Sequence, residues 1–106
     1  MFRRQIISTL ALFVVTGLVN AGEIEVLQKD KAFGVHQLKI KVGDSINFKN
    51  ADAYSHNVFS LSDAKSFDLG SYPQGQAKKV AFDKAGTVEV ECAIHPQMKL
   101  TVEVTD

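Results

Sequence analysis

The chain has 106 residues and carries twelve basic and twelve acidic side chains, so its formal net charge is zero. These charges are interspersed and form no basic stripe, which argues against nucleic acid as a partner. A chain of this length has room for one small domain.

The N-terminus has the pattern of a secretory signal peptide. Arg3 and Arg4 precede an almost unbroken apolar run at residues 6–19. The run leads into residues 19–21, Val-Asn-Ala, which place small residues before the expected cleavage point. The apolar run is shorter than the roughly 18 residues expected of a membrane span. We therefore expect cleavage after Ala21, export to the periplasm, and a mature domain of residues 22–106 without membrane insertion. An uncleaved N-terminal anchor is the alternative.

The remaining sequence is dominated by a period of two between apolar and polar residues, which is typical of half-buried strands. No helical pattern of convincing length is present. Residues 62–72 carry the weakest signal and are expected to form a loop with one short strand around 67–69. Regularly spaced short strands predict an all-β sandwich or small barrel. The other expected strands lie around residues 23–27, 38–42, 46–48, 56–61, 80–82, 88–92 and 98–104.

Three residues with metal-binding side chains lie close together near the C-terminus. The alternation points Cys92 inward at the end of one strand and Met98 inward at the start of the next, with His95 in the loop between them. Cys92 is the sole cysteine, so an exported chain cannot use it in an internal disulfide. Soft sulfur donors with imidazole favour copper, zinc or iron–sulfur chemistry over magnesium or calcium.

A blue-copper electron-transfer site needs two histidines, one cysteine and a weak axial methionine, so a second histidine must be found. His56 follows a loop signal at residues 50–52 and opens a strand, which allows it to lie at the same end of the sandwich. His36 is the other candidate, but Gly34 nearby can shift the pleat of its strand. We expect His56 to join the site and His36 to be solvated.

The segments GDSINFKNADAYSHNVF and AFDKAGTVEVECAIHPQM resemble the cupredoxins, the type 1 blue-copper proteins. The resemblance covers residues 35–104, and the spacing Cys-x-x-His-x-x-Met is similar to the short ligand loop of amicyanin. It implies a Greek-key β-sandwich of seven to eight strands. It also implies one copper ion near one end, bound by His56, Cys92, His95 and Met98.

The same resemblance assigns a role to Asn57, the residue after the first histidine. Its backbone N–H is expected to donate to the sulfur of Cys92, and its side chain to tie the two ligand segments together. The chain departs from the family nearby. Val90 and Glu91 stand close before the cysteine, where an aromatic residue is usual. Ile94 stands where proline is frequent, and Gln97 where amicyanin has an aromatic residue. These departures leave the four ligands intact and bear on the docking surface.

The function implied is a non-enzymatic carrier of single electrons that alternates between Cu(I) and Cu(II). By resemblance His95 is the electron port, within an apolar surface formed by Ala93, Ile94 and Pro96. We expect a monomer that meets a redox donor and a redox acceptor. A copper-binding module for delivery or storage is one alternative. A metal-free accessory β-sandwich is the other.

Overall fold

The computed structural model describes residues 22–106, and the expected signal peptide at residues 1–21 lies outside the described residues. Within residues 22–106 the chain forms nine strands. No helix in this part of the chain is long and apolar enough to cross a membrane. The strands are β1 (Glu23–Lys29), β2 (Ala32–Phe33), β3 (Gln37–Lys41), β4 (Ser45–Asn50), β5 (His56–Ser62), β6 (Lys65–Tyr72), β7 (Ala77–Ala81), β8 (Gly86–Cys92) and β9 (Lys99–Thr105).

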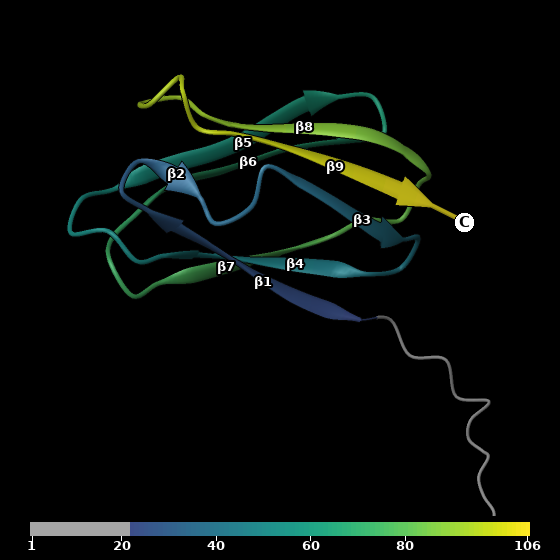
Figure 1. Ribbon diagram of the computed structural model, residues 1–106, viewed down its shortest axis with the longest axis horizontal. Coiled ribbons are helices and arrows are strands. Elements are labelled where there is room, and N and C mark those ends of the chain that lie inside the picture. Colours follow the sequence, from purple (N-terminus) through teal and green to yellow (C-terminus); the bar gives the residue numbers. More distant parts are fainter. Residues whose placement is uncertain (1–21) are drawn as a thin grey trace, which may run out of the picture.

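The strands form two sheets that pack face to face, as Figure 1 shows. One sheet has the order β2-β1-β4-β7 and the other the order β3-β9-β8-β5-β6. Each sheet mixes antiparallel pairs with one parallel pair, β1 with β4 and β3 with β9. The predicted all-β sandwich is therefore confirmed.

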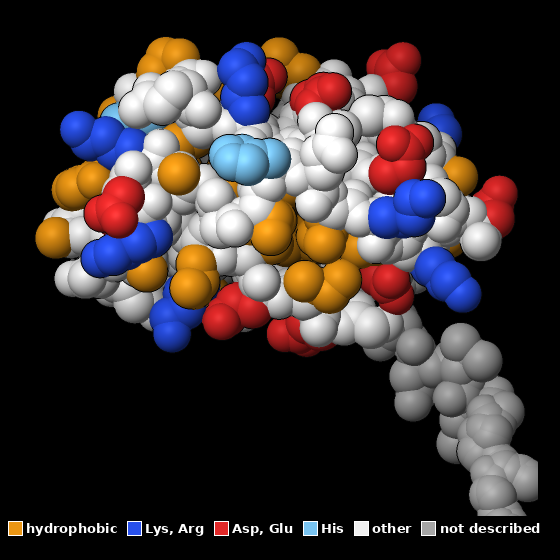
Figure 2. All heavy atoms as spheres, viewed as in Figure 1, with side chains coloured by type: hydrophobic (Ala, Val, Ile, Leu, Met, Phe, Trp, Pro, Cys, Tyr) orange, Lys and Arg blue, Asp and Glu red, His pale blue; other side chains and the backbone are white. Residues whose placement is uncertain are grey.

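The core follows from the alternation in the sequence. Val88, Val90 and Cys92 point inward from β8 and are buried, whereas Glu89 between them is exposed. β9 repeats this pattern with buried Leu100, Val102 and Val104. Burying one such side chain contributes roughly 1.5–3 kcal/mol relative to leaving it exposed, so these two strands anchor the sandwich. On the face shown in Figure 2, acidic and basic side chains are interspersed, as the sequence predicts.

Three details differ from the expectation. Residues 65–72 form a complete strand, β6, rather than a loop with a short strand. This strand lies at a sheet edge, and only Tyr72 at its end is fully buried. The two-residue strand β2 is created by its hairpin with β1. Val42 is 39% exposed rather than inward, because β3 ends at Lys41 and the chain turns at Gly43, where φ is 100°.

Several connections between strands lie together at one end of the sandwich. The turn between β1 and β2, the loop between β4 and β5, and the loop between β8 and β9 all lie at the end opposite the C-terminus (Figure 1). A backbone bond joins the β4–β5 loop to the end of β1, since Ala51 donates its N–H to the carbonyl of Gln28 across 2.9 Å. The candidate site is built from this end.

Candidate metal centre

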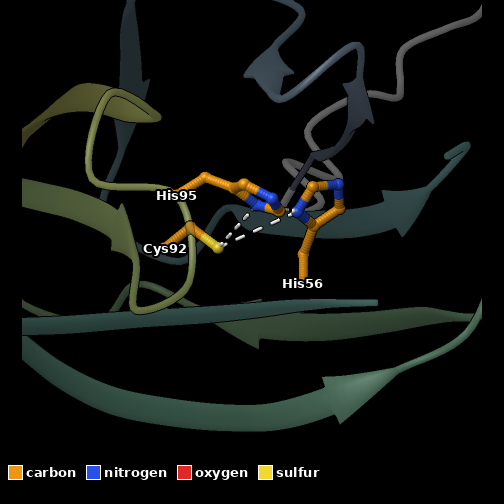
Figure 3. Close-up of side chains that lie close together, drawn as sticks. All are labelled: His56, Cys92 and His95. Atoms are coloured by element: carbon orange, nitrogen blue, oxygen red, sulfur yellow. Dashed lines mark hydrogen bonds between the residues drawn. The ribbon is translucent and has the colours of Figure 1, made fainter. Parts of the chain in front are cut away.

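Three side chains from two of these connections converge on one point (Figure 3). His56 begins β5, Cys92 ends β8, and His95 lies in the loop that follows β8. The Nδ1 atoms of His56 and His95 are 3.1 Å apart, and the Sγ of Cys92 lies 3.8 Å from each. His56 and Cys92 are buried, and His95 is half-buried. The structure thus brings together three of the four predicted site residues in one triangle of donor atoms.

The size of this triangle matches a metal ion of the transition series. A point equidistant from the three donor atoms lies about 2.1 Å from each, close to typical metal–nitrogen and metal–sulfur bond lengths. A simple hydrogen bond between the two rings would not require the sulfur to be equidistant from both nitrogens. Two nitrogen donors and a thiol that converge in this way fit a soft or borderline cation such as copper.

The strand pairing fixes Cys92 beside the segment that carries His56. β5 and β8 run antiparallel, with Val58 opposite Cys92. The backbone N–H of Asn57 donates to the Cys92 sulfur across 3.5 Å, as predicted, and the N–H of Ala93 donates to the carbonyl of Asn57 across 2.9 Å. Because both segments are held by main-chain bonds, the relative position of these two donors depends little on side-chain flexibility.

The predicted role of the Asn57 side chain is wrong. Its amide donates to Asp68 on β6 across 2.9 Å rather than to the ligand loop. The pairing of β5 with β6 shifts register between Asn57 and Phe59, and such irregularities re-aim side chains. The residue after Cys92 is Ala93, whose methyl group offers no hydrogen-bonding partner. Asn57 therefore ties the two ligand segments together through its backbone and not through its side chain.

Met98 completes the loop next to this cluster. Its backbone N–H donates to the carbonyl of His95 across 2.9 Å, and its side chain is fully buried. The β8–β9 ladder ends at the pair of Glu91 with Lys99, and Cys92 and Met98 are the next residues beyond this pair. The inward direction expected for both sulfur-bearing residues is confirmed by their burial.

His36 is exposed, and among the described residues the metal-compatible cluster consists of His56, Cys92 and His95. The backbone carbonyl of His36 accepts a bond from Thr101 across 3.0 Å, which pins its loop beside β9. This position agrees with the expectation that His36 is solvated.

Asp52 is a buried residue of the site that the sequence interpretation did not single out. Its Oδ2 lies 2.6 Å from Nε2 of His56, and it is 2% exposed. Burial opposes ionisation, but hydrogen bonds from His56 and from the N–H groups of Asp30 and Lys31 lower the pKa of Asp52 overall. Metal-binding histidines commonly donate their other ring N–H to a carboxylate. The position of Asp52, four residues before His56, was therefore the sequence feature that could have indicated this contact.

Hydrogen bonding orients the ring of His56, and the electrostatics favour the unprotonated form of His95. The carboxylate of Asp52 faces Nε2 of His56, which leaves Nδ1 of that ring with a free lone pair directed at the cluster. Partial burial, together with the nearby His56 ring and Lys31, lowers the pKa of His95. A metal ligand must be unprotonated, so this shift reduces competition from protons.

The outer surface of the cluster is apolar. The ring of Tyr54 lies edge-on to His56, with centroids 5.4 Å apart, and 5.7 Å from His95. Tyr54 is 41% exposed and Ile94 is 51% exposed. Ala93 and Pro96, which lie on either side of Ile94 and His95 in the ligand loop, are also exposed. Tyr54 belongs to the loop before His56, and sequence reasoning did not assign it to this surface.

Comparison with known proteins decides the family. The family model for copper-binding proteins of the plastocyanin/azurin family matches residues 20–105. The chain belongs to this family. This cupredoxin is 29% identical over 111 residues to amicyanin-alpha of Methylorubrum extorquens, with 92% of this chain and 93% of the relative covered. It is 37% identical to the methylamine utilization protein MauL of the same organism over 68 residues, which span 63% of this chain and 60% of MauL.

Solved structures agree with this assignment. The cupredoxin superposes on the Cu(I) form of an amicyanin mutant with a TM-score of 0.72 and 28% identity, covering 83% of this chain and 87% of that one. A copper-containing nitrite reductase from Thermus scotoductus aligns with a TM-score of 0.74 at 23% identity, covering 79% of this chain and 22% of that one, which shows a shared fold alone. Copper is therefore the metal that both the family and the donor set indicate.

Proposed function

We propose that this cupredoxin is an exported carrier of single electrons whose copper ion is bound by His56, Cys92, His95 and Met98. The observation that carries the proposal is the triangle formed by two Nδ1 atoms and one Sγ, with sides of 3.1, 3.8 and 3.8 Å. In this assignment the two rings and the thiolate are the strong donors and Met98 is the weak one. Copper supplies the exchange of one electron between Cu(I) and Cu(II).

The protein contributes a preformed donor set. His56 and Met98 are fully buried and Cys92 is 2% exposed, so little solvent has to reorganise around them. The main-chain bonds from Asn57 and Ala93 hold the two ligand strands at fixed separation. A site that keeps its geometry when an electron arrives or leaves has a low cost of rearrangement, which suits rapid transfer.

Electron exchange with partners is assigned to the exposed side of His95. This ring is half-buried, and the exposed apolar side chains of Tyr54 and Ile94 lie next to it in space or in sequence. A redox donor and a redox acceptor would pack on this apolar surface and approach the ring closely. Export to the periplasm, with cleavage after Ala21, is part of the same proposal and rests on the N-terminal sequence pattern.

Electron transfer and copper delivery predict different behaviour of the loaded protein. A carrier exchanges electrons rapidly between its Cu(I) and Cu(II) forms and retains copper when challenged with a chelator. We expect this result, because His56 and Cys92 are buried on paired strands and Met98 is buried next to the start of β9. Slow self-exchange combined with ready loss of copper would instead identify a delivery or storage module. A metal-free accessory domain would bind no copper in either oxidation state.

A further inference from the structure

The turn between β1 and β2 has an unusual backbone conformation. Asp30 and Lys31 have φ values of 55° and 59°, and among residues 22–106 they are the only residues other than glycine with positive φ. They form the two-residue connection between Lys29 and Ala32, where positive φ at both positions is normally supplied by Asn-Gly or a similar pair. Such strain persists only where the surroundings impose it, and it clusters at functional sites.

The group that imposes this conformation is the carboxylate of Asp52. Its Oδ1 accepts the N–H of Asp30 across 2.7 Å, and its Oδ2 accepts the N–H of Lys31 across 3.3 Å. Asp52 is itself fixed, because its own N–H donates to the side chain of buried Asn50 across 2.8 Å. A turn far away in the sequence is thus tied to the loop that leads into His56.

The same carboxylate contacts the proposed copper ligand. Oδ2 of Asp52 lies 2.6 Å from Nε2 of His56, in a place where both side chains are buried. Three donors, two from the turn and one from the ring, therefore converge on two carboxylate oxygens. Only a side chain with two accepting oxygen atoms, such as a carboxylate, satisfies all three donors. This arrangement keeps the proton of His56 on Nε2 and leaves Nδ1 free.

We propose that Asp52 is a positioning residue for His56, and that the left-handed turn at Asp30 and Lys31 exists to clamp its carboxylate against that ring. The clamp rests on the proposed function, because its purpose is to present Nδ1 of His56 to copper. The β1–β2 hairpin, which supplies no metal ligand, thereby becomes part of the structure that positions the metal centre.

The first test replaces Asp52 with asparagine and needs no copper. Asparagine must turn an NH₂ group either toward the turn or toward Nε2 of His56, and the second arrangement moves the ring proton to Nδ1. We expect ¹⁵N NMR of the copper-free protein, at a pH where the ring is neutral, to show the Nε2–H form in the wild type and a large Nδ1–H population in Asp52→Asn. An unchanged proton position in Asp52→Asn would overturn the proposal.

The same variant is then loaded with copper. Loss of a hydrogen-bonded partner behind a metal-binding histidine typically weakens metal binding about ten- to a hundredfold, and we expect a loss of that size with altered electron-spin-resonance parameters. Asp63→Asn is the matched control, because Asp63 is an exposed acid in the β5–β6 turn, and it should match the wild type. Wild-type affinity and spectra in Asp52→Asn would contradict the proposal. Failure of the wild type itself to bind copper would instead count against the proposed function, while the NMR result would still stand.

The second test perturbs the turn and leaves Asp52 in place. Lys31→Gly removes the cost of positive φ, so it should raise the unfolding midpoint and preserve the proton position of His56. Lys31→Val increases the strain, so it should loosen the turn and increase the Nδ1–H population of His56. Gly43→Val, which strains the β3–β4 turn where φ is 100°, is the control for general destabilisation. If Lys31→Val loosens the turn without moving the proton or weakening copper binding, the turn is not part of the clamp.

Discussion

The backbone N–H of Asn57 donates to the sulfur of Cys92 across 3.5 Å, while the side chain of Asn57 turns away to Asp68. The contact with the sulfur therefore depends on the path of the main chain and not on the identity of residue 57. Residue 57 can therefore be changed without loss of this contact as long as β5 and β8 keep their register.

Because the side chain of Asn57 does not contact the sulfur, Asn57→Ala should have a small effect on stability and none on the copper site. The variant loses the bond to Asp68 and keeps the bond to the sulfur, so we expect it to lose about 0.5–1.5 kcal/mol of unfolding free energy, toward the lower end because the bond is exposed. The visible spectrum of the copper form should be unchanged. Urea unfolding of the copper-free protein and an absorption spectrum check both points. Asp68→Ala should destabilise by more, because Asp68 also accepts the N–H of Gly70 across 2.9 Å. A spectral shift confined to Asn57→Ala would show that its side chain does act on the sulfur.

Met98 has two roles that two substitutions separate. It is fully buried in the core, so Met98→Ala should cost the copper-free protein about 2–5 kcal/mol. Met98→Leu conserves volume and should cost less than about 1.5 kcal/mol. Both remove the thioether, and since fewer donors favour the singly charged ion, both should raise the reduction potential. Denaturant unfolding without copper and voltammetry with copper measure the two effects. An unchanged potential in Met98→Leu would remove Met98 from the ligand set.

Much of this architecture could be predicted from the sequence, because each inward position of β8 and β9 carries an apolar residue and each outward position a polar one. The same alternation located Cys92 and Met98 at one end of the core. The clamp by Asp52 could not be predicted, since it depends on a turn at Asp30 that is remote in sequence. The Asn57 side chain was misassigned because a register shift in an edge pairing leaves no local signal.

Copper should stabilise the folded chain by mass action. A ligand that binds only the native state at a hundred times its dissociation constant adds about 2.7 kcal/mol of unfolding free energy. We therefore expect the melting temperature to rise with free copper concentration in the wild type. In His95→Ala the rise should be much smaller, because one strong donor is lost from a half-buried position that tolerates truncation. A wild-type melting temperature that does not change with copper concentration would support the metal-free alternative.

Asp44 predicts an acid-dependent loss of stability far from the metal centre. Bonds from the backbone N–H groups of Lys41 and Gly22 lower the pKa of Asp44 from its ordinary value of 3.8. The ionised form is thus favoured in the folded state, so its contribution is present above 3.8 and is lost as the pH falls through the lower folded value. Copper-free Asp44→Asn should be less stable than the wild type near neutral pH and should approach it in strong acid. A difference in urea midpoint that does not change with pH would contradict this assignment.

The central claim is that His56, Cys92, His95 and Met98 form a copper site of the blue-copper type. Titration of the purified domain of residues 22–106 with copper(II), followed by visible absorption and electron-spin resonance, tests it most directly. We expect an intense sulfur-to-copper charge-transfer band that saturates at one copper ion per chain and disappears in Cys92→Ser. Absence of the band in the wild type, or its survival in Cys92→Ser, would contradict the claim.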